Sequence, residues 1–537
     1  MMRKSVQRPP IWLLLAGALA CLLYFATERW LLAGDLGFPL DDSWIHLQFA
    51  RNLAEGRGLS YNPGELVTGS TAPLWTALLA LLFALPGSVV VWTKLLGVVL
   101  YLAGIDATWR LARELDLPRG LAALAAGLTL STSWLVWSAL SGMEVPLFVL
   151  LSLWGLLLHL RERHAPTAPT RPPLSLGLLA VSALARPEGL LLLALAFADR
   201  CLTFDRPSGE GEDGGGALVW RRPSWKGLAA GALLAVCALA GALLFYRWAG
   251  GSFLPTTFAA KGGDDVRRLL PNLQYLHTVL GIFFGPQPWM TLAAGAGVVV
   301  LVERLGTRRD HGLLPALWLL GLPLAYSLIS KAGRGAILGN FGRYYFPLFP
   351  VLVVLGVLGL ERAARALGPR LVRLSLAALL ALLILWPTVA NLVRGAGRYA
   401  QNVRNVQDSD VRIARWLAPR LPPEAVLAVN DIGAIKYFLP NRIVDLVGIA
   451  SPELRRETRD AVRAGAGWDQ ALADAVARRQ PDYLVVFPTW VPGLVRQPGY
   501  RPVSSLTIPS NITMGGNEIV VYETPWTRYR LRAVQSP

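Results

Sequence analysis

Charged residues are scarce in this sequence. Asp, Glu, Lys and Arg make up only 16% of the 537 residues, whereas hydrophobic residues make up 53% and the mean hydropathy is +0.43. Soluble domains carry about 25% charged residues, so the composition excludes an ordinary soluble enzyme. Apolar runs recur between Ile11 and Leu392, and several reach the ~20 residues that cross the ~30 Å hydrocarbon core of a bilayer. The sequence therefore predicts a polytopic α-helical membrane protein.

Cysteine is also scarce. The three cysteines, Cys21, Cys201 and Cys237, lie in or beside the apolar runs. Their spacing fits neither a disulfide framework nor a zinc site.

The net charge is +17, which raises the question of nucleic-acid binding. The Arg and Lys residues do not form one patch with interleaved aromatics; they lie in short loops between apolar runs. This pattern is typical of cytoplasmic loops that face anionic lipid headgroups. We therefore expect membrane lipids, and no nucleic acid, as partners.

Loop charges also orient the chain. Arg3, Lys4 and Arg8 precede the first run, which places the N-terminus in the cytoplasm and Asp41-Asp42 outside. The stretch 73–86 is short, and if it crossed, the next basic loop would lie outside; we therefore expect it to lie at the outer interface as a juxtamembrane helix. The predicted spans number about eleven, at about 10–33, 89–108, 120–139, 144–160, 174–186, 189–200, 227–249, 288–303, 313–330, 345–360 and 371–392.

The composition changes at about residue 393. Residues 1–393 form the predicted transmembrane domain, and residues 394–537 carry only short apolar runs. An alternation of strand-length runs with helical stretches predicts a small α/β domain, which the loop charges place on the extracytoplasmic side. The predicted strands are 426–429, 442–446, 483–487 and 518–522, and the helical stretches include 411–417 and 469–478.

Ionisable residues collect on the predicted outer side. Such residues near membrane depth are costly and usually functional, and acids with bases on one face suggest a site that binds an anion and activates a hydroxyl. They are Asp41, Asp42, His46, Arg51, Glu144, Arg186, Glu188, Lys261, Lys331, Arg334 and Arg343.

Each of these residues also has a purely structural interpretation, and most of these stay open at this stage. The acid pair caps a helix in that interpretation, and His46 is a satisfied histidine four residues after Asp42 on the same helical face. The structural alternatives for the rest are a cap for Glu144, an ion pair for Arg186 with Glu188, and headgroup anchors for Lys261 and Arg343.

The residues around the acid pair form a specific pattern. Asp41-Asp42-Ser43-Trp44-Ile45-His46 continues through Gly56-Arg57-Gly58-Leu59 and Tyr61-Asn62-Pro63-Gly64-Glu65 to Gly69-Ser70-Thr71-Ala72-Pro73-Leu74-Trp75. This resembles the first outer loop of type C (GT-C) glycosyltransferases, the polyprenyl-phosphate-sugar-dependent membrane enzymes, and is most similar to actinobacterial cell-wall arabinofuranosyltransferases and related bacterial enzymes. Weaker matches are Gly142-Met143-Glu144, Arg186-Pro187-Glu188-Gly189, Leu254-Pro255-Thr256-Thr257 with Lys261, Arg343-Tyr344-Tyr345-Phe346-Pro347, Asn430-Asp431-Ile432-Gly433-Ala434 and Asp445-Leu446-Val447-Gly448.

The resemblance implies an inverting glycosyltransferase. It would move a sugar from a polyprenyl-phosphate carrier to a glycan, glycolipid or protein acceptor at the outer face of the bacterial cytoplasmic membrane. In this family the segment after the acidic loop is a juxtamembrane helix that does not cross, in agreement with the loop charges around 73–86.

The resemblance also implies roles for residues. A carboxylate takes the acceptor proton, and cations stabilise the departing lipid phosphate. Asp41 or Asp42 is the expected base, with Asp41 favoured because the first acid of the family's pair usually has that role. A divalent cation at this pair stays open. The expected phosphate-binding cations are Lys261, Arg343 and Arg186, and the expected sugar contacts or supporting residues are Glu144, His46, Glu188, Trp44 and Tyr344; the two aromatics are equally consistent with interfacial anchors.

Other functions remain as alternatives. A flippase or transporter of lipid-linked sugars is one, a glycan polymerase or ligase another, and a structural assembly subunit a third. Transporters usually place charges at the midplane within inverted repeats. Here the charges lie at one interface and no repeat is found, which favours the transferase.

Overall fold

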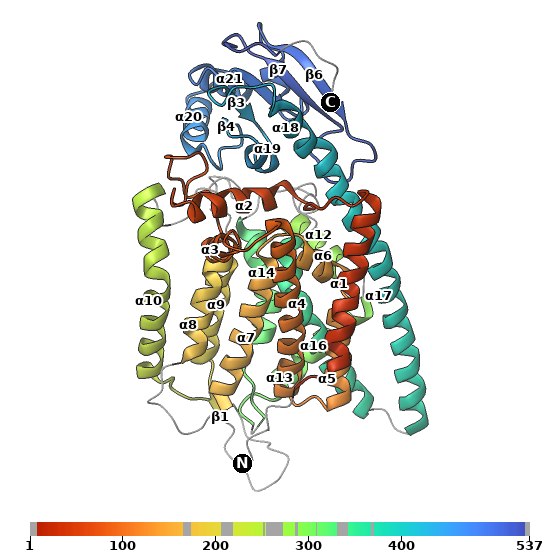
Figure 1. Ribbon diagram of the computed structural model, residues 1–537. Helices are drawn as coiled ribbons and strands as arrows, with labels where there is room; N and C mark the ends of the chain where they lie inside the picture. Colours follow the sequence, from red (N-terminus) through yellow and green to blue (C-terminus); the bar gives the residue numbers. More distant parts are fainter. Residues whose placement is uncertain are drawn as a thin grey trace.

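A bundle of helices carries a smaller sheet domain at one end (Figure 1). The structure is a computed structural model that describes residues 8–164, 173–205, 218–250, 253, 272–284, 288–307, 309–329, 342–366 and 370–531. The bundle consists of α1 (Ile11–Leu31), α4 (Val89–Glu114), α5 (Arg119–Leu130), α6 (Ser133–Leu140), α7 (Val145–His164), α8 (Leu174–Ala185), α9 (Glu188–Cys201), α10 (Trp225–Gly250), α12 (Leu273–Phe284), α13 (Pro288–Glu303), α14 (Leu314–Ile329), η1 (Arg343–Leu348), α16 (Phe349–Ala366) and α17 (Arg370–Val406).

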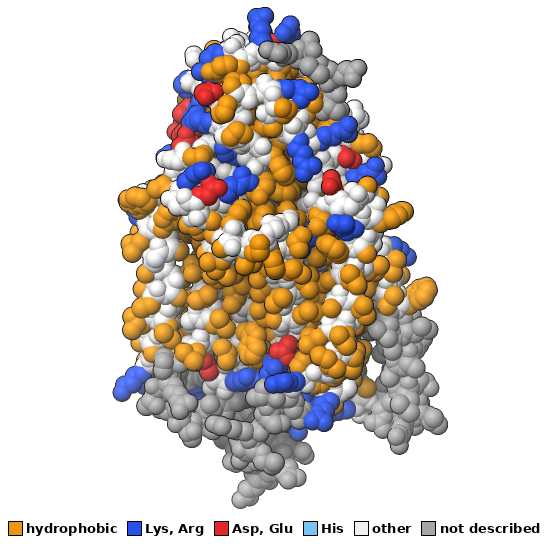
Figure 2. Space-filling view, viewed as in Figure 1, with side chains coloured by type: hydrophobic (Ala, Val, Ile, Leu, Met, Phe, Trp, Pro, Cys, Tyr) orange, Lys and Arg blue, Asp and Glu red, His pale blue; other side chains and the backbone are white. Residues whose placement is uncertain are grey.

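The flanks of the bundle are apolar. Figure 2 shows hydrophobic side chains over its sides, with Lys and Arg gathered at the end away from the sheet domain and over that domain itself. On α10 the side chains of Leu233, Val236 and Trp248 are more than half exposed, as lipid-facing residues are. The chain is a multi-pass membrane protein.

The number of spans depends on how bent helices are counted. Among the described residues, five helices are long and apolar enough to cross a membrane, and seven if each of two bent pairs is one span. The predicted figure of about eleven also included shorter apolar segments, such as α8 and α14, and stays a prediction.

One predicted span, 120–139, is broken in the structure. It forms α5 and α6, which meet at an angle of 58°. Ser131 and Thr132 lie at the break. Their hydroxyls donate to the carbonyls of Gly127 and Leu128, respectively, at 2.9 Å. Hydroxyls that bond back to a helical carbonyl often bend the helix.

The segment between α1 and α4, residues 32–88, is called the first loop below. It contains α2 (Asp41–Ala54), which lies between the bundle and the sheet domain, and α3 (Pro73–Leu82) at the same end (Figure 1). With 10 residues, α3 spans only about 15 Å, too short to cross a bilayer, as the loop charges predicted. Of the 14 residues of α2, nine are buried, because it packs against structure on both sides.

The C-terminal domain contains a five-stranded mixed sheet in the order β4-β3-β5-β7-β6. The first three strands in this order are parallel, and β7 and β6 continue it antiparallel. The strands are β3 (Val426–Val429), β4 (Arg442–Asp445), β5 (Tyr483–Val486), β6 (Arg501–Thr507) and β7 (Glu518–Glu523). The helical elements are η2 (Gln407–Val411), α18 (Arg412–Leu417), α19 (Gly433–Phe438), α20 (Pro452–Arg463), α21 (Trp468–Ala477) and α22 (Pro492–Val495).

The first loop completes the core of this domain. One face of the sheet, with Ala428 and Leu484, is covered by the α20–α22 side. The opposite face, with Leu427 and Val485, packs with α18 and α19, and also with Ile45, Phe49, Tyr61 and Val67 of the first loop. The acid pair and the C-terminal domain are therefore parts of one packed unit.

A buried ion pair fixes the helix that leads into the C-terminal domain. Lys94 of α4 donates to the carboxylate of Glu28 in α1 at 2.9 Å and to the hydroxyl of Tyr399 in α17 at 2.5 Å. All three side chains are almost fully buried. The upper part of α17 is thereby held against α1 and α4.

Candidate functional site

Asp41 is held by the C-terminal domain. It begins α2, and its carboxylate accepts hydrogen bonds from the backbone N–H groups of Gly433 at 2.6 Å and Ala434 at 2.7 Å, at the start of α19. Gly433 has no side chain to obstruct this contact; a Cβ there would lie 2.1 Å from the carbonyl oxygen of Asp41. Burial raises the pKa of Asp41 to about 7, although the two amides favour the ionised form.

Asp42 faces the bundle instead. Its carboxylate forms an ion pair with the Nη2 of Arg343, the first residue of η1. The Arg343 side chain is buried, while that of Asp42 is 32% exposed. Gly342 precedes Arg343 in the left-handed conformation, with φ at +67°, a turn that glycine adopts without strain. The Nε and Nη1 atoms of Arg343 are buried and have no hydrogen-bond partner among the described residues.

Three charged side chains form a buried cluster below the acid pair. Arg186 donates to Glu144 and, at 2.7 Å, to Glu188. His46 of α2 approaches Glu144 with 3.3 Å between Nε2 and Oε2, and Tyr326 of α14 donates to Glu188 at 2.7 Å. All four charged or titratable side chains are less than 10% exposed. Every nitrogen of the Arg186 guanidinium points to a carboxylate.

Tyr344 connects the cluster with the acid pair. Its ring centroid lies 5.1 Å from the guanidinium carbon of Arg186 and 5.7 Å from that of Arg343, in the range of cation–π contacts. The structure therefore brings together most of the predicted site residues: Asp41, Asp42, His46, Glu144, Arg186, Glu188, Arg343 and Tyr344.

Two sets of predicted residues stand apart. Trp44 is 2% exposed and packs against Phe38, Tyr437 and Phe438, with ring centroids about 5 Å apart; it joins α2 to α19. Lys261, Lys331 and Arg334 lie outside the described residues.

Several residues that shape the site have no predicted role. Gly433 and Ala434 anchor Asp41, and Tyr61 donates to the carbonyl of Ile432 at 2.6 Å. A signal was present, because this segment directly follows the carboxyl end of β3, where ligand-binding loops of parallel sheets gather.

No group of three or more His, Cys, Asp or Glu side chains among the described residues is arranged to hold a metal ion. The divalent cation considered at Asp41-Asp42 stays a prediction.

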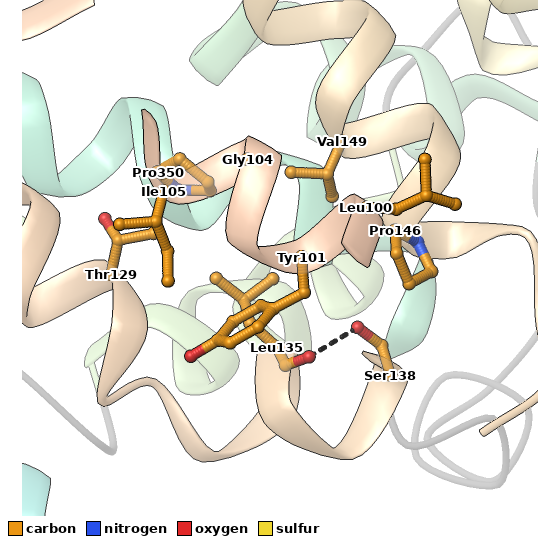
Figure 3. Close-up of a pocket in the computed structure, with 10 residues that line it drawn as sticks. All are labelled: Leu100, Tyr101, Gly104, Ile105, Thr129, Leu135, Ser138, Pro146, Val149 and Pro350. Carbon is orange, nitrogen blue, oxygen red and sulfur yellow. Dashed lines mark hydrogen bonds between the residues drawn. The ribbon is translucent and has the colours of Figure 1, made fainter. Parts of the chain in front are cut away.

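A small apolar pocket lies within the bundle (Figure 3). It is lined by side chains of α4 to α7 such as Tyr101, Leu135 and Val149, together with Pro350 of α16, and by no acidic or basic side chain. The dashed line in Figure 3 marks a bond within α6, from Ser138 to the carbonyl of Leu135, 2.8 Å long. This pocket therefore offers packing space and no chemistry.

The C-terminal part of the chain, residues 396–522, matches a family described as a domain of unknown function, DUF8728. The chain matches no curated protein sequence.

Solved structures share the fold over nearly the whole chain. ArnT from Cupriavidus metallidurans bound to undecaprenyl phosphate has a TM-score of 0.57 at 14% identity, covering 95% of this chain and 97% of ArnT. ArnT in its apo state gives 0.55 at 16% identity with the same coverage. The apo oligosaccharyltransferase of Archaeoglobus fulgidus gives 0.55 at 13% identity, covering 94% of this chain and 74% of the enzyme.

Proposed function

We propose that this protein is an inverting GT-C glycosyltransferase that moves a sugar from a polyprenyl-phosphate carrier to an acceptor hydroxyl. Two observations support this function independently of the site geometry. The first-loop sequence resembles that of such enzymes, and the fold is shared with ArnT, which has been solved with undecaprenyl phosphate bound. The alternatives of flippase and polymerase have no specific observation in their favour.

The observation that carries the proposal is that the Arg343 guanidinium is buried and only partly hydrogen-bonded. Its guanidinium is buried beside the acid pair, yet Nε and Nη1 have no hydrogen-bond partner among the described residues. Leaving a buried donor unpaired costs about 1–3 kcal/mol, more when it is charged. Phosphate oxygens accept charge-assisted hydrogen bonds from such donors. We therefore assign the donor phosphate to Arg343.

The acid pair then has two tasks. The acceptor oxygen attacks the anomeric carbon, the bond from that carbon to the phosphate oxygen breaks, and its electron pair leaves with the lipid phosphate. Asp41 takes the acceptor proton; a base whose pKa lies near the working pH suits this role. Asp42 holds Arg343 through their ion pair, so that the cation faces the phosphate.

Arg186 receives a different role from the one expected. Two carboxylates already engage three of its five N–H donors and offset its charge, so Arg186 is a weaker phosphate ligand than Arg343. In this proposal Arg186 holds Glu144 near His46 and supports the ring of Tyr344. His46 and Glu144 are then available to contact the sugar or the acceptor.

The finer features belong to the same proposal. The resemblance suggests arabinofuranose as the donor sugar, while mannose, galactose, glucose or an aminosugar fits the same scaffold; the acceptor is a cell-envelope glycan, glycolipid or protein. The membrane is the bacterial cytoplasmic membrane, with the N-terminus inside and the active site and C-terminal domain outside.

The test uses purified full-length protein in nanodiscs with a panel of radiolabelled polyprenyl-phosphate sugars and an envelope lipid extract. We expect label transfer by the wild type and a loss of at least about 10²-fold for Arg343→Gln, since this removes a transition-state cation. Arg362→Gln is the matched control, because Arg362 is an exposed arginine of α16, the helix that follows η1, and pairs with Glu303.

Asp41→Asn and Asp42→Asn complete the set. Unchanged transfer by Asp41→Asn would rule out its role as base. Movement of the labelled lipid across the bilayer without transfer would show a flippase instead.

A further inference from the structure

Five aspartates meet where the first loop contacts the C-terminal domain. They are Asp41 and Asp42 of α2, Asp410 of η2, Asp431 directly after β3, and Asp445 at the end of β4. Charge repulsion from Asp42 and Asp445 raises the pKa of Asp41, and repulsion from Asp431 and Asp41 raises that of Asp410.

Three of the five are compensated. Asp42 has its ion pair with Arg343. Asp41 accepts the two α19 amides described above. Asp445 accepts two backbone amides from the loop after β4, at 2.8 and 2.7 Å. Anionic carboxylates are stable in such environments.

Asp410 has no such compensation, whereas Asp431 is partly exposed to solvent. Asp410 is fully buried, and neither of its carboxylate oxygens has a hydrogen-bond partner among the described residues. Its nearest charges are Asp431 and Asp41, both negative. The acids acting on Asp431 are Asp41, Asp42 and Asp445. Burial and these neighbours raise the pKa of both groups well above the ordinary value.

The charged groups on the surrounding elements do not offset the charge of an ionised Asp410. Lys436 of α19 donates to the carbonyls of Pro440 and Asn441. On α18, Arg415 lies over the ring of Phe438. At the end of α17, Arg404 pairs with the more exposed Asp408.

A buried carboxylate without a hydrogen-bond partner requires either a proton or a cation. The described part of the chain holds no group of three acidic or histidine ligands arranged for a metal ion. Calcium usually takes six to eight oxygen ligands, so the geometry favours the proton.

We propose that Asp410 retains a proton at neutral pH, and that it positions Asp41 through the start of α19, against which η2 packs. The connection is short. Asp431 leads into this segment and is followed by Ile432, whose carbonyl is held by Tyr61, and then by Gly433 and Ala434, whose amides hold Asp41. Asp410 lies in a π-helical turn, a distortion often found at functional sites. The role in positioning rests on the proposed function; the proton on Asp410 does not.

The first experiment measures the thermal midpoint of the full-length protein in nanodiscs from pH 5 to pH 9. An acid whose folded pKa is raised loses stability as the pH rises from its unfolded pKa of about 4 to its folded pKa. Asparagine carries no charge, so we expect Asp410→Asn to exceed the wild type by a margin that grows with pH, on the order of 2 °C or more at pH 9. Asp408→Asn, two residues earlier and partly exposed, is the matched control and should run parallel to the wild type.

The second experiment tests the link to Asp41. Hydrogen exchange at fixed pH, read on the peptide that carries the Gly433 and Ala434 amides, should be unchanged in Asp410→Asn and faster in Asp410→Ala, which leaves a cavity. The pH profile of sugar transfer should extend further to the alkaline side in Asp410→Asn than in the wild type or Asp408→Asn.

The outcomes separate cleanly. Parallel melting curves for Asp410→Asn and the wild type would overturn the assignment of a proton to Asp410, whatever the transfer activity. A midpoint that rises with calcium and falls with chelator in the wild type, but not in Asp410→Asn, would show a cation site instead. Growing stabilisation of Asp410→Asn with pH, together with unchanged hydrogen exchange in Asp410→Ala, would leave the protonated Asp410 but remove its positioning role.

Discussion

Gly433→Ala tests the contact between the C-terminal domain and Asp41 with a single methyl group. The added Cβ would lie 2.1 Å from the carbonyl oxygen of Asp41 and within 2.8 Å of both carboxylate oxygens. Real Cβ contacts are hardly ever shorter than 3.0 Å, so α19 and α2 must separate by about 1 Å. The opposing atoms include backbone, which cannot rotate away as a flexible side chain would.

The separation has two measurable consequences. The hydrogen bonds from Gly433 and Ala434 to a charged acceptor lengthen or break, and such bonds are each worth about 1.5–3 kcal/mol. A misplacement of ~1 Å at a reacting group lowers the rate by about 10²-fold. We therefore expect Gly433→Ala to reduce kcat for sugar transfer by roughly that factor while KM for the lipid donor changes little, because Arg343 is not displaced.

The assay is radiolabel transfer by protein in nanodiscs, with substrate titration to separate kcat from KM. Gly467→Ala is the control, because Gly467 lies in the same domain and a Cβ there meets nothing within 4 Å. Wild-type kcat in a folded Gly433→Ala protein would refute the reasoning that the α19 amides position Asp41.

Three further predictions follow from the same contacts. Transfer should rise about tenfold per pH unit below about 7 and level off above it, because Asp41 must be ionised to accept a proton; a rate independent of pH between 5 and 8 would contradict this. Undecaprenyl phosphate should raise the melting temperature of the wild type but not of Arg343→Gln, since binding to the folded state adds about 2.7 kcal/mol at a hundredfold excess over Kd; equal shifts would remove Arg343 from the phosphate site. Lys94→Met should lower the free energy of unfolding by about 3–5 kcal/mol, because it leaves the buried carboxylate of Glu28 without its cation. In a denaturation experiment, adding Glu28→Gln to the same chain should restore most of this loss.

Local patterns in the sequence predict much of this structure. The runs at 426–429 and 483–487 correspond to β3 and β5 within one residue, because buried parallel strands are continuous apolar runs. The short apolar stretch after Pro73 forms a helix too short to cross. By contrast, β6 was not predicted: it contains Pro502 and alternates weakly, and it lies at the edge of the sheet, where such residues are tolerated.

The sequence predicts which types of residue form the site, but it does not predict which groups contact one another there. The sequence indicates that Asp41 and Asp42 are important, but the partner of Asp41 lies 392 positions later in the chain. The two amides of α19 are backbone groups, which leave no side-chain signature. The predicted phosphate role of Arg186 stays untested by the structure. Its ion pair with Glu188 was one of the structural alternatives in the sequence, but its contact with Glu144, 42 positions earlier, arises from helix packing that periodicity does not specify.

The first loop shares a hydrophobic core with the C-terminal sheet, so it cannot complete its packing until the C-terminal domain has been synthesised. Phe49 and Tyr61 are made about 430 residues before Val485, the strand residue in the same core. At about 5–20 residues per second, the ribosome needs on the order of 20 to 80 seconds to deliver that partner. During this interval α2 holds aromatic side chains without a surface to cover them. A chaperone or the insertion machinery is therefore expected to hold the loop until the last quarter of the chain has been delivered.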